Sequence, residues 1–350
     1  MGGWRNIMKN AGMYLTAAAF ALCLGCDGGN DRDPSNSQVK LTASDALIRT
    51  LAGGESLLDE NSGTFAWVNA DGLLVAFDAK TGATRQLNGA ATAPPFATVR
   101  SVAVNSDGTV AWLYQADRAE NGAYHSDYVA MDEKTEIART GFDRQDLSMD
   151  LPASVAASGD YFVFSAPTDE SGARIFRTYS ASTGRFQSEL MPHFAMFGGV
   201  AYDVRMHGTS VGFRTEDSYV TGDITGLNLS VYVESYMVAT DFNGQSIAWA
   251  TWYDNNAYIG TAGRLGENGY DLDEEARSKP TCTRCVAMSW DGRFAAWNAT
   301  DGIRYADRRH QGASQGLVPG AAEFVLDGAT LYYIAAGTDG SVGLYRRLLE

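Results

Sequence analysis

In this sequence of 350 residues, few of the side chains that could act in catalysis or bind a metal lie close together along the chain. The four histidines are scattered over different segments: His125, His193, His207 and His310. Cys282-Thr-Arg-Cys285 has the spacing of a redox or zinc motif, but zinc would need two more ligands. Nothing around it resembles the strand–helix–strand unit of a thioredoxin. We therefore favour a disulfide between Cys282 and Cys285 that staples a loop, with redox chemistry as the alternative.

Other catalytic patterns are weak. Gly312-Ala-Ser-Gln-Gly316 matches the nucleophile elbow, which requires a strand, a sharp turn and a helix, whereas the surrounding sequence predicts a hairpin of small residues. An enzyme should collect acids, histidine or tyrosine on neighbouring loops. Two groups satisfy that description: His125 with Tyr124 and Asp127, and Tyr253 with Asp254.

Acidic residues recur along the chain, one in each of seven repeats. They are Asp71, Asp117, Asp169, Glu216, Asp254, Asp301 and Asp339. Tight turns favour Asp for conformational reasons, so turn chemistry alone could produce this pattern. The alternative is a rim of carboxylates around a central channel, which we define as the candidate binding rim. It would suit a cationic ligand, a basic protein surface or Ca²⁺, which prefers several oxygen ligands; no other cofactor is expected.

The elements that would position these acids are repeated hairpins. Asn105-Ser-Asp-Gly-Thr-Val-Ala-Trp112 returns as Ser289-Trp-Asp-Gly-Arg-Phe-Ala-Ala-Trp297, and looser copies surround both. The turn glycines of all copies are Gly63, Gly108, Gly159, Gly208, Gly244, Gly292 and Gly328. Their spacing averages about 44 residues, the period of a four-stranded propeller blade. The sequence thus predicts an all-β, seven-bladed β-propeller, with six or eight blades as the alternatives.

The last repeat is one strand short. Its strands are expected over residues 322–326, 330–335 and 342–348, after which the sequence ends. Because an open strand edge is a liability, we expect the N-terminal part of the domain to supply the missing outer strand. The candidates are residues 39–43 and residues 46–51.

The first 25 residues have the layout of a secretory signal peptide. Arg5 and Lys9 precede an apolar run over residues 11–24, and Cys23-Leu-Gly-Cys26 follows. This end resembles a bacterial lipoprotein signal, and the resemblance implies lipidation of Cys26 and an anchor in a membrane. We expect a signal peptide over residues 1–25, a polar flexible tether over 26–38 and one propeller domain over 39–350.

The charge of the chain excludes one class of partner. Without residues 1–25, which contain two cations and no acid, the net charge moves from −15 to −17. Phosphate backbones would be repelled, so nucleic acid is not an expected partner.

A family resemblance lies in the repeated phrase itself. Asn105-Ser-Asp-Gly108 with Val110-Ala-Trp112, and Ser289-Trp-Asp-Gly292 with Ala295-Ala-Trp297, resemble the blade signature of TolB-like and WD-repeat-like propellers. The resemblance covers roughly residues 56–350 and implies a fold used mostly for binding, with no catalytic residue carried over.

The functional expectation is a scaffold rather than an enzyme. We expect a monomeric propeller of the bacterial cell envelope, lipid-anchored at the periplasmic face or the cell surface, that binds an envelope protein or a small ligand through the candidate binding rim. The alternative is a propeller enzyme, a lyase or glycoside-acting protein, with its site at the mouth of the central channel.

Overall fold

A computed structural model describes most of the domain. The described residues are 45–52, 55–69, 71, 73–87, 97–120, 123–145, 147, 151–170, 174–189, 202–215, 218–224, 230–233, 237–253, 256–262, 270–276, 286–299, 301–309, 316–321, 323–337 and 340–349. They form seven antiparallel sheets of four strands each. All the secondary structure described is β, so the prediction of an all-β fold is confirmed.

The first four sheets follow the chain in order, from the innermost strand outward. They consist of β2 (Ser56–Asn61), β3 (Thr64–Val68), β4 (Leu74–Asp78) and β5 (Thr84–Gln86); β6 (Ala97–Val104), β7 (Val110–Glu120), β8 (Ala123–Asp132) and β9 (Glu136–Arg144); β10 (Ser154–Ser158), β11 (Tyr161–Pro167), β12 (Arg174–Ser180) and β13 (Arg185–Glu189); β14 (Tyr202–His207), β15 (Ser210–Arg214), β16 (Ser218–Asp223) and β17 (Ser230–Val233).

The remaining three sheets repeat the arrangement, except that the last one takes its outer strand from the start of the domain. They consist of β18 (Met237–Phe242), β19 (Ile247–Tyr253), β20 (Asn256–Ala262) and β21 (Tyr270–Ala276); β22 (Val286–Met288), β23 (Phe294–Ala299), β24 (Gly302–Asp307) and β25 (Gly316–Pro319); β26 (Glu323–Asp327), β27 (Thr330–Ala336), β28 (Val342–Leu348) and β1 (Asp45–Leu51).

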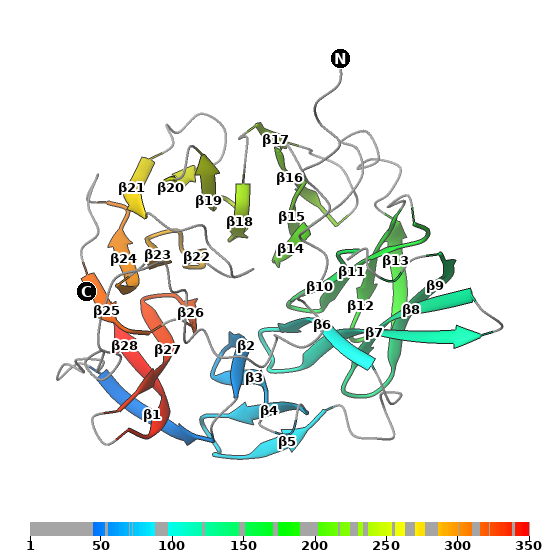
Figure 1. Cartoon of the computed structure of the whole chain (residues 1–350), viewed down its shortest axis with the longest axis horizontal. Helices are drawn as coiled ribbons and strands as arrows, with labels where there is room; N and C mark the ends of the chain where they lie inside the picture. The colour runs from blue at the N-terminus through cyan, green and yellow to red at the C-terminus, as the bar shows by residue number, and fades with distance from the viewer. Residues whose placement is uncertain are drawn as a thin grey trace.

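The seven sheets stand around a common centre (Figure 1). Each innermost strand contacts the innermost strand of the next sheet, from β2 through β6, β10, β14, β18 and β22 to β26, and β26 contacts β2 again. The sheets therefore form a closed ring, and we number its blades one to seven from the sheet that begins with β2.

The last blade is completed by the N-terminal strand. β1 pairs antiparallel with β28, from Asp45 opposite Arg347 to Leu51 opposite Val342. The second of the two candidate segments, residues 46–51, thus lies in the position expected for the missing strand; the first, residues 39–43, lies outside the described residues.

The predicted turns explain why the hairpins form where they do. At Asn105 the side-chain Oδ1 accepts a hydrogen bond from the Thr109 amide at 2.8 Å, and the Gly108 amide donates to the Asn105 carbonyl at 3.0 Å. Gly108 has φ 81°, a conformation that is costly for a residue with a Cβ. A positive φ is found at every turn glycine named from the sequence: Gly63, Gly108, Gly159, Gly208, Gly244, Gly292 and Gly328.

The core lies between blades, where the faces of neighbouring sheets pack together. Trp112 of blade two is 2% exposed and packs in a cluster with Ala66 and Leu74 of blade one. Trp297 of blade six is fully buried, in a cluster with Ile259 of blade five. Burying one large apolar side chain contributes about 2 to 3 kcal/mol. The aromatic residue that ends each repeated phrase therefore holds adjacent blades together.

Candidate functional site: the central channel

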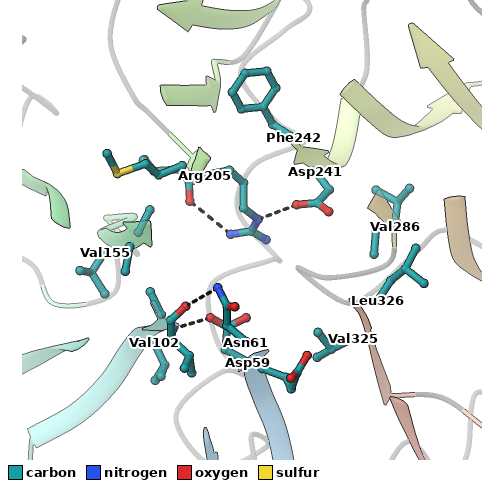
Figure 2. A pocket seen from close by; sticks show the side chains of 18 of the residues that line it. Asp59, Asn61, Val102, Val155, Arg205, Asp241, Phe242, Val286, Val325 and Leu326 are labelled. Atoms are coloured by element: carbon teal, nitrogen blue, oxygen red, sulfur yellow. Dashed lines mark hydrogen bonds and ion pairs between the residues drawn. The ribbon is translucent and has the colours of Figure 1, made fainter. Parts of the chain in front are cut away.

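A cavity of about 180 Å³ lies at the centre of the ring. Every innermost strand contributes lining residues to it, so the cavity is part of the central channel. Most of the lining residues have apolar side chains, as with Val102, Val155 and Val286, and the polar side chains come from β2, β14 and β18 (Figure 2). These are Asp59, Glu60, Asn61, Arg205 and Asp241, which we call the channel polar group.

Arg205 and Asp241 form an ion pair across two neighbouring blades. The Arg205 Nε lies 3.0 Å from Asp241 Oδ1, and Nη1 donates to the Val204 carbonyl at 3.2 Å. Figure 2 shows the guanidinium extending from β14 towards Asp241 on β18. The two side chains are 23% and 19% exposed. The pair therefore holds a positive and a negative group at fixed positions on the channel wall.

Two carboxylates of the channel polar group also brace neighbouring blades. Asp59 Oδ2 accepts a hydrogen bond from the Val104 amide of the next blade at 2.7 Å. Asp241 Oδ2 accepts one from the Met288 amide of its next blade at 2.8 Å. A backbone amide on an innermost strand has no further strand to pair with on the channel side, and the carboxylate supplies the missing acceptor. These acids thus have a structural role that does not depend on any ligand.

Polar residues at the ends of the innermost strands make similar contacts. The Nδ2 atom of Asn61 donates to the Val104 carbonyl at 3.3 Å, and that of Asn105 donates to the Gly159 carbonyl at 3.3 Å. Asn243 Nδ2 donates to the Ser289 carbonyl at 3.0 Å. Each contact runs from one blade to the next. Like the two carboxylate braces, they fix the register of adjacent blades at the channel.

Glu60 differs from the other channel acids. Its Oε1 accepts a hydrogen bond from the Gly63 amide at 2.7 Å, while Oε2 is buried with no hydrogen-bond partner among the described residues. Glu60 is only 6% exposed. Burial, together with the charges of Asp327 and Asp59, raises the pKa of Glu60 to about 8, against the opposing effect of the Gly63 amide. At neutral pH this carboxyl is mostly protonated.

The size and composition of the cavity limit what it can do chemically. Pockets for small organic ligands usually measure about 300 to 1,000 Å³, so this cavity of about 180 Å³ suits water or a small polar group. Among the residues that the structure describes, no group of three or more His, Cys, Asp or Glu side chains is arranged to hold a metal ion.

The candidate binding rim is described in part. Asp71, Asp117, Asp169 and Asp301 are all exposed. Asp117 accepts hydrogen bonds from Gln115 Nε2 at 2.9 Å and Ser126 Oγ at 2.5 Å, and Asp301 pairs with Arg304 at 3.0 Å. The Arg304 guanidinium lowers the pKa of Asp301, which is therefore charged at neutral pH. These four acids stand on four different blades, and their joint role stays a prediction.

The other predicted site residues lie outside the described ranges. They are Cys26, Glu216, Asp254, Cys282, Cys285 and Asp339. The lipidation site, the disulfide and three members of the candidate binding rim thus remain predictions from the sequence. In the described part of the chain, no helix has the length and apolar character needed to cross a membrane.

The group at His125 is brought together by the structure. His125 and Asp127 lie on β8, and Asp143 lies on β9. His125 Nδ1 is 2.7 Å from Asp143 Oδ1, and its Nε2 is 3.4 Å from Asp127 Oδ1. Tyr124 is adjacent and 40% exposed. Because both ring nitrogens face carboxylates, the imidazole is held within a charged cluster on the sheet surface.

No motif or spacing in the sequence marks the channel polar group. Its members stand on innermost strands, whereas the predicted site residues belong mostly to the connections between strands. One signal was nevertheless present in the aligned repeats. Each innermost strand leads to a polar residue at the first turn, and the residue directly before that polar residue is apolar in six repeats, namely Val104, Ala157, Met206, Phe242, Met288 and Leu326. In the first repeat the equivalent residue is Glu60, which precedes Asn61.

Comparisons with known proteins support the fold. No family model and no curated protein matches the sequence. The chain is similar to the structure of YCF48 from Cyanidioschyzon merolae, at 10% identity and TM-score 0.52, over 87% of this chain and 99% of that one. It is also similar to the Pan2 WD40 domain of Neurospora crassa, at 10% identity and TM-score 0.48, over 84% and 90% of the two chains.

A further similar structure is TolB from Acinetobacter baumannii, at 16% identity and TM-score 0.41, over 64% of this chain and 56% of that one. Likeness at such identities bears on fold alone. The predicted fold class is confirmed by the ring of antiparallel sheets together with the likeness to YCF48. This chain is a β-propeller.

Proposed function

We propose that this chain is a lipid-anchored β-propeller of the bacterial cell envelope that acts as a scaffold for binding a protein or a small ligand. The observation that carries the proposal is the closed ring, in which the innermost strands contact one another all the way round. Loops mounted on such a ring keep fixed relative positions, which is what a binding face requires.

The proposed binding face is the candidate binding rim. Its four described acids are exposed: Asp71, Asp169 and Asp301 follow the second strands of blades one, three and six, and Asp117 lies near the end of the second strand of blade two. In antiparallel sheets with equivalent innermost strands, the connections after the second strands lie on the same face of the ring. Carboxylates collected on one face would attract a basic protein surface, an organic cation or Ca²⁺.

The envelope location and the anchor are supported by the residues before the fold. The signal-like segment ends at Gly25-Cys26, and a polar tether separates Cys26 from β1. Labelling cells with a palmitate analogue should therefore mark the wild-type chain and leave Cys26→Ser unmarked. A Cys26→Ser chain that still carries the label and stays in the membrane fraction would contradict lipidation at this residue.

The binding face can be tested with two matched variants of equal charge. The rim variant carries Asp71→Asn, Asp169→Asn and Asp301→Asn. The control carries Asp107→Asn, Asp160→Asn and Asp291→Asn in turns, where asparagine suits the same local hydrogen bonds. Both triple variants remove three negative charges, so any difference between them reflects position.

The readout is binding of polylysine and of Ca²⁺ to the purified full-length chains, together with crosslinking in intact envelopes. We expect the rim variant to lose at least tenfold in affinity for the cationic probe and to lose its crosslinked partner, while the control behaves as wild type. Equal binding by the two variants would reject the rim as the working face.

A further inference from the structure

Glu60 occupies a place where the fold otherwise has an apolar side chain. The equivalent residues of the other six blades are Val104, Ala157, Met206, Phe242, Met288 and Leu326. A buried carboxyl at such a position costs free energy relative to an apolar side chain unless it is neutral or fully hydrogen-bonded. Glu60 is 6% exposed and its Oε2 makes no hydrogen bond among the described residues.

The side chain lies at the interface between blade one and blade seven. β2 contacts β26, and the ring of Phe65 on β3 packs edge-on against Tyr332 on β27, with centroids 4.9 Å apart. Asp327 ends β26 in the same way that Asn61 ends β2. Glu60, Asp327 and Tyr332 therefore gather three titratable groups where the last blade meets the first.

Four of the other six blade interfaces are joined differently at this level. There, an amide or hydroxyl group at the strand end bonds to the backbone of the next blade: Asn61 to Val104, Asn105 to Gly159, Ser158 to Gly208 and Asn243 to Ser289. At the closing interface the strand-end residue is a carboxyl, Asp327, and a second carboxyl, Glu60, stands on the opposite blade.

Glu60 is buried and Asp327 is partly buried, and two such carboxyl groups on facing strands penalise each other's charge. Burial and the charge of Asp327 raise the pKa of Glu60 to about 8, and burial raises the pKa of Asp327 as well. Burial, Glu60 and Asp327 together raise the pKa of Tyr332 to about 12, and Arg346 opposes that shift. Asp59, on the same strand as Glu60, adds a further negative charge.

We propose that ring closure is controlled by a proton: a proton held by the Glu60 carboxyl, at the interface with the blade of Asp327, keeps blade seven against blade one, and its loss loosens that interface. Blade seven is otherwise held to the first blade by packing and by Arg49 of β1, whose Nη1 donates to Thr84 Oγ1 of β5 at 2.8 Å and whose guanidinium lies over the Trp67 ring. Deprotonation would thus act on the one blade whose strands come from both ends of the chain.

The test is urea unfolding of the full-length chain in detergent from pH 5 to pH 9. In this range the folded state holds a proton on Glu60 that the unfolded chain has released, so folding should weaken as the pH rises and level off above about pH 8. The unfolding equilibrium constant should increase up to about tenfold per pH unit in the wild type.

Two variants test whether Glu60 is the residue that holds the proton. Glu60→Gln keeps the shape without the charge, and Glu60→Met installs the residue type of blades four and six. Both should remove the pH dependence, so failure of one to fold leaves the other as the probe. Asp327→Asn should shift the fall in stability to lower pH, and Asp107→Asn, in the turn of blade two, should leave it unchanged.

Hydrogen exchange shows where the loosening occurs. Corrected for intrinsic rates, the amides of β26 and β28 should exchange faster at pH 8.5 than at pH 6 in the wild type, and equally in Glu60→Gln. The proposal is overturned if wild-type stability is the same at pH 5 and pH 8, if both Glu60 variants keep the wild-type slope, or if exchange increases uniformly over all blades.

Discussion

Asp45 and Arg347 form a two-point ion pair between residues 302 positions apart in the sequence. Nε lies 2.6 Å from Oδ1 and Nη2 lies 2.7 Å from Oδ2. The side chains are 0% and 6% exposed, and Nη1 also donates to the Leu317 carbonyl of blade six at 2.9 Å. The pair therefore fastens the N-terminal strand to the last strand and to the neighbouring blade.

Removing one partner of this pair should be costly. Arg347→Met leaves the Asp45 carboxylate buried without its counter-ion, and losses of about 3 to 5 kcal/mol in unfolding free energy are typical of such changes. Arg346→Met is the matched control, because Arg346 is exposed beside it on the same strand. Urea unfolding at pH 6 measures both. Equal stability of the two variants would show that the pair contributes little.

Deleting the strand itself is a stronger version of the same test. A chain that begins at Asp45 retains β1, whereas one that begins at Ala52 leaves the edge of β28 without its partner. We expect the first to unfold cooperatively and the second to lose cooperative unfolding, because an open blade exposes both a strand edge and apolar surface. Calorimetry compares the two. Identical transitions would mean that β1 is dispensable.

The channel brace at Asp241 should contribute measurably to stability. Asp241→Ala removes the acceptor of the Met288 amide and the counter-ion of Arg205. Loss of a hydrogen bond to a charged group costs about 2 kcal/mol. Glu136→Ala is a suitable control, because its pair with Arg139 is exposed at the surface, where such pairs contribute under about 1 kcal/mol. A loss at Asp241 no larger than that of the control would contradict its role.

Asp307 provides a pH dependence opposite in sign to that of Glu60. The guanidinium of Arg309, with a further contribution from Arg293, holds the pKa of Asp307 well below its usual range. The folded state thus favours the charged form, and this stabilisation is present above pH 4 and is lost as the pH falls below it.

We therefore expect Asp307→Asn to be less stable than the wild type at pH 7, with the difference shrinking towards pH 3. Thermal unfolding at the two pH values measures the effect. A difference that stays constant between pH 7 and pH 3 would show that the charge of Asp307 is not its source.

The features that the sequence predicts best are those set by residues that lie close together in the chain. The turn at Asn105 to Gly108 is specified by four consecutive residues, and it forms as expected with a positive φ at Gly108. The outer strand of the last blade could be narrowed to two segments, because an incomplete repeat requires a partner. Choosing between them depends on the pairing of β1 with β28, which links opposite ends of the sequence.

The channel polar group was not predictable in the same way. Arg205 and Asp241 lie 36 positions apart on different blades, and their contact depends on how adjacent sheets pack. No local pattern sets that packing. Glu60 was accessible in principle, because comparison of equivalent positions shows one acid among six apolar residues. That Glu60 lies across the blade interface from Asp327 could be known only from the assembled ring.

The pairing of β1 with β28 also bears on how the protein is made. Among the described strands, β1 is synthesised first and β28 last. Blades one to six can form in succession as the chain emerges, but β1 must wait, with one edge unpaired, until β28 has been made. The ring can therefore close only after β28 has emerged, and a translation product interrupted before β28 would keep that edge of β1 exposed to proteases and chaperones.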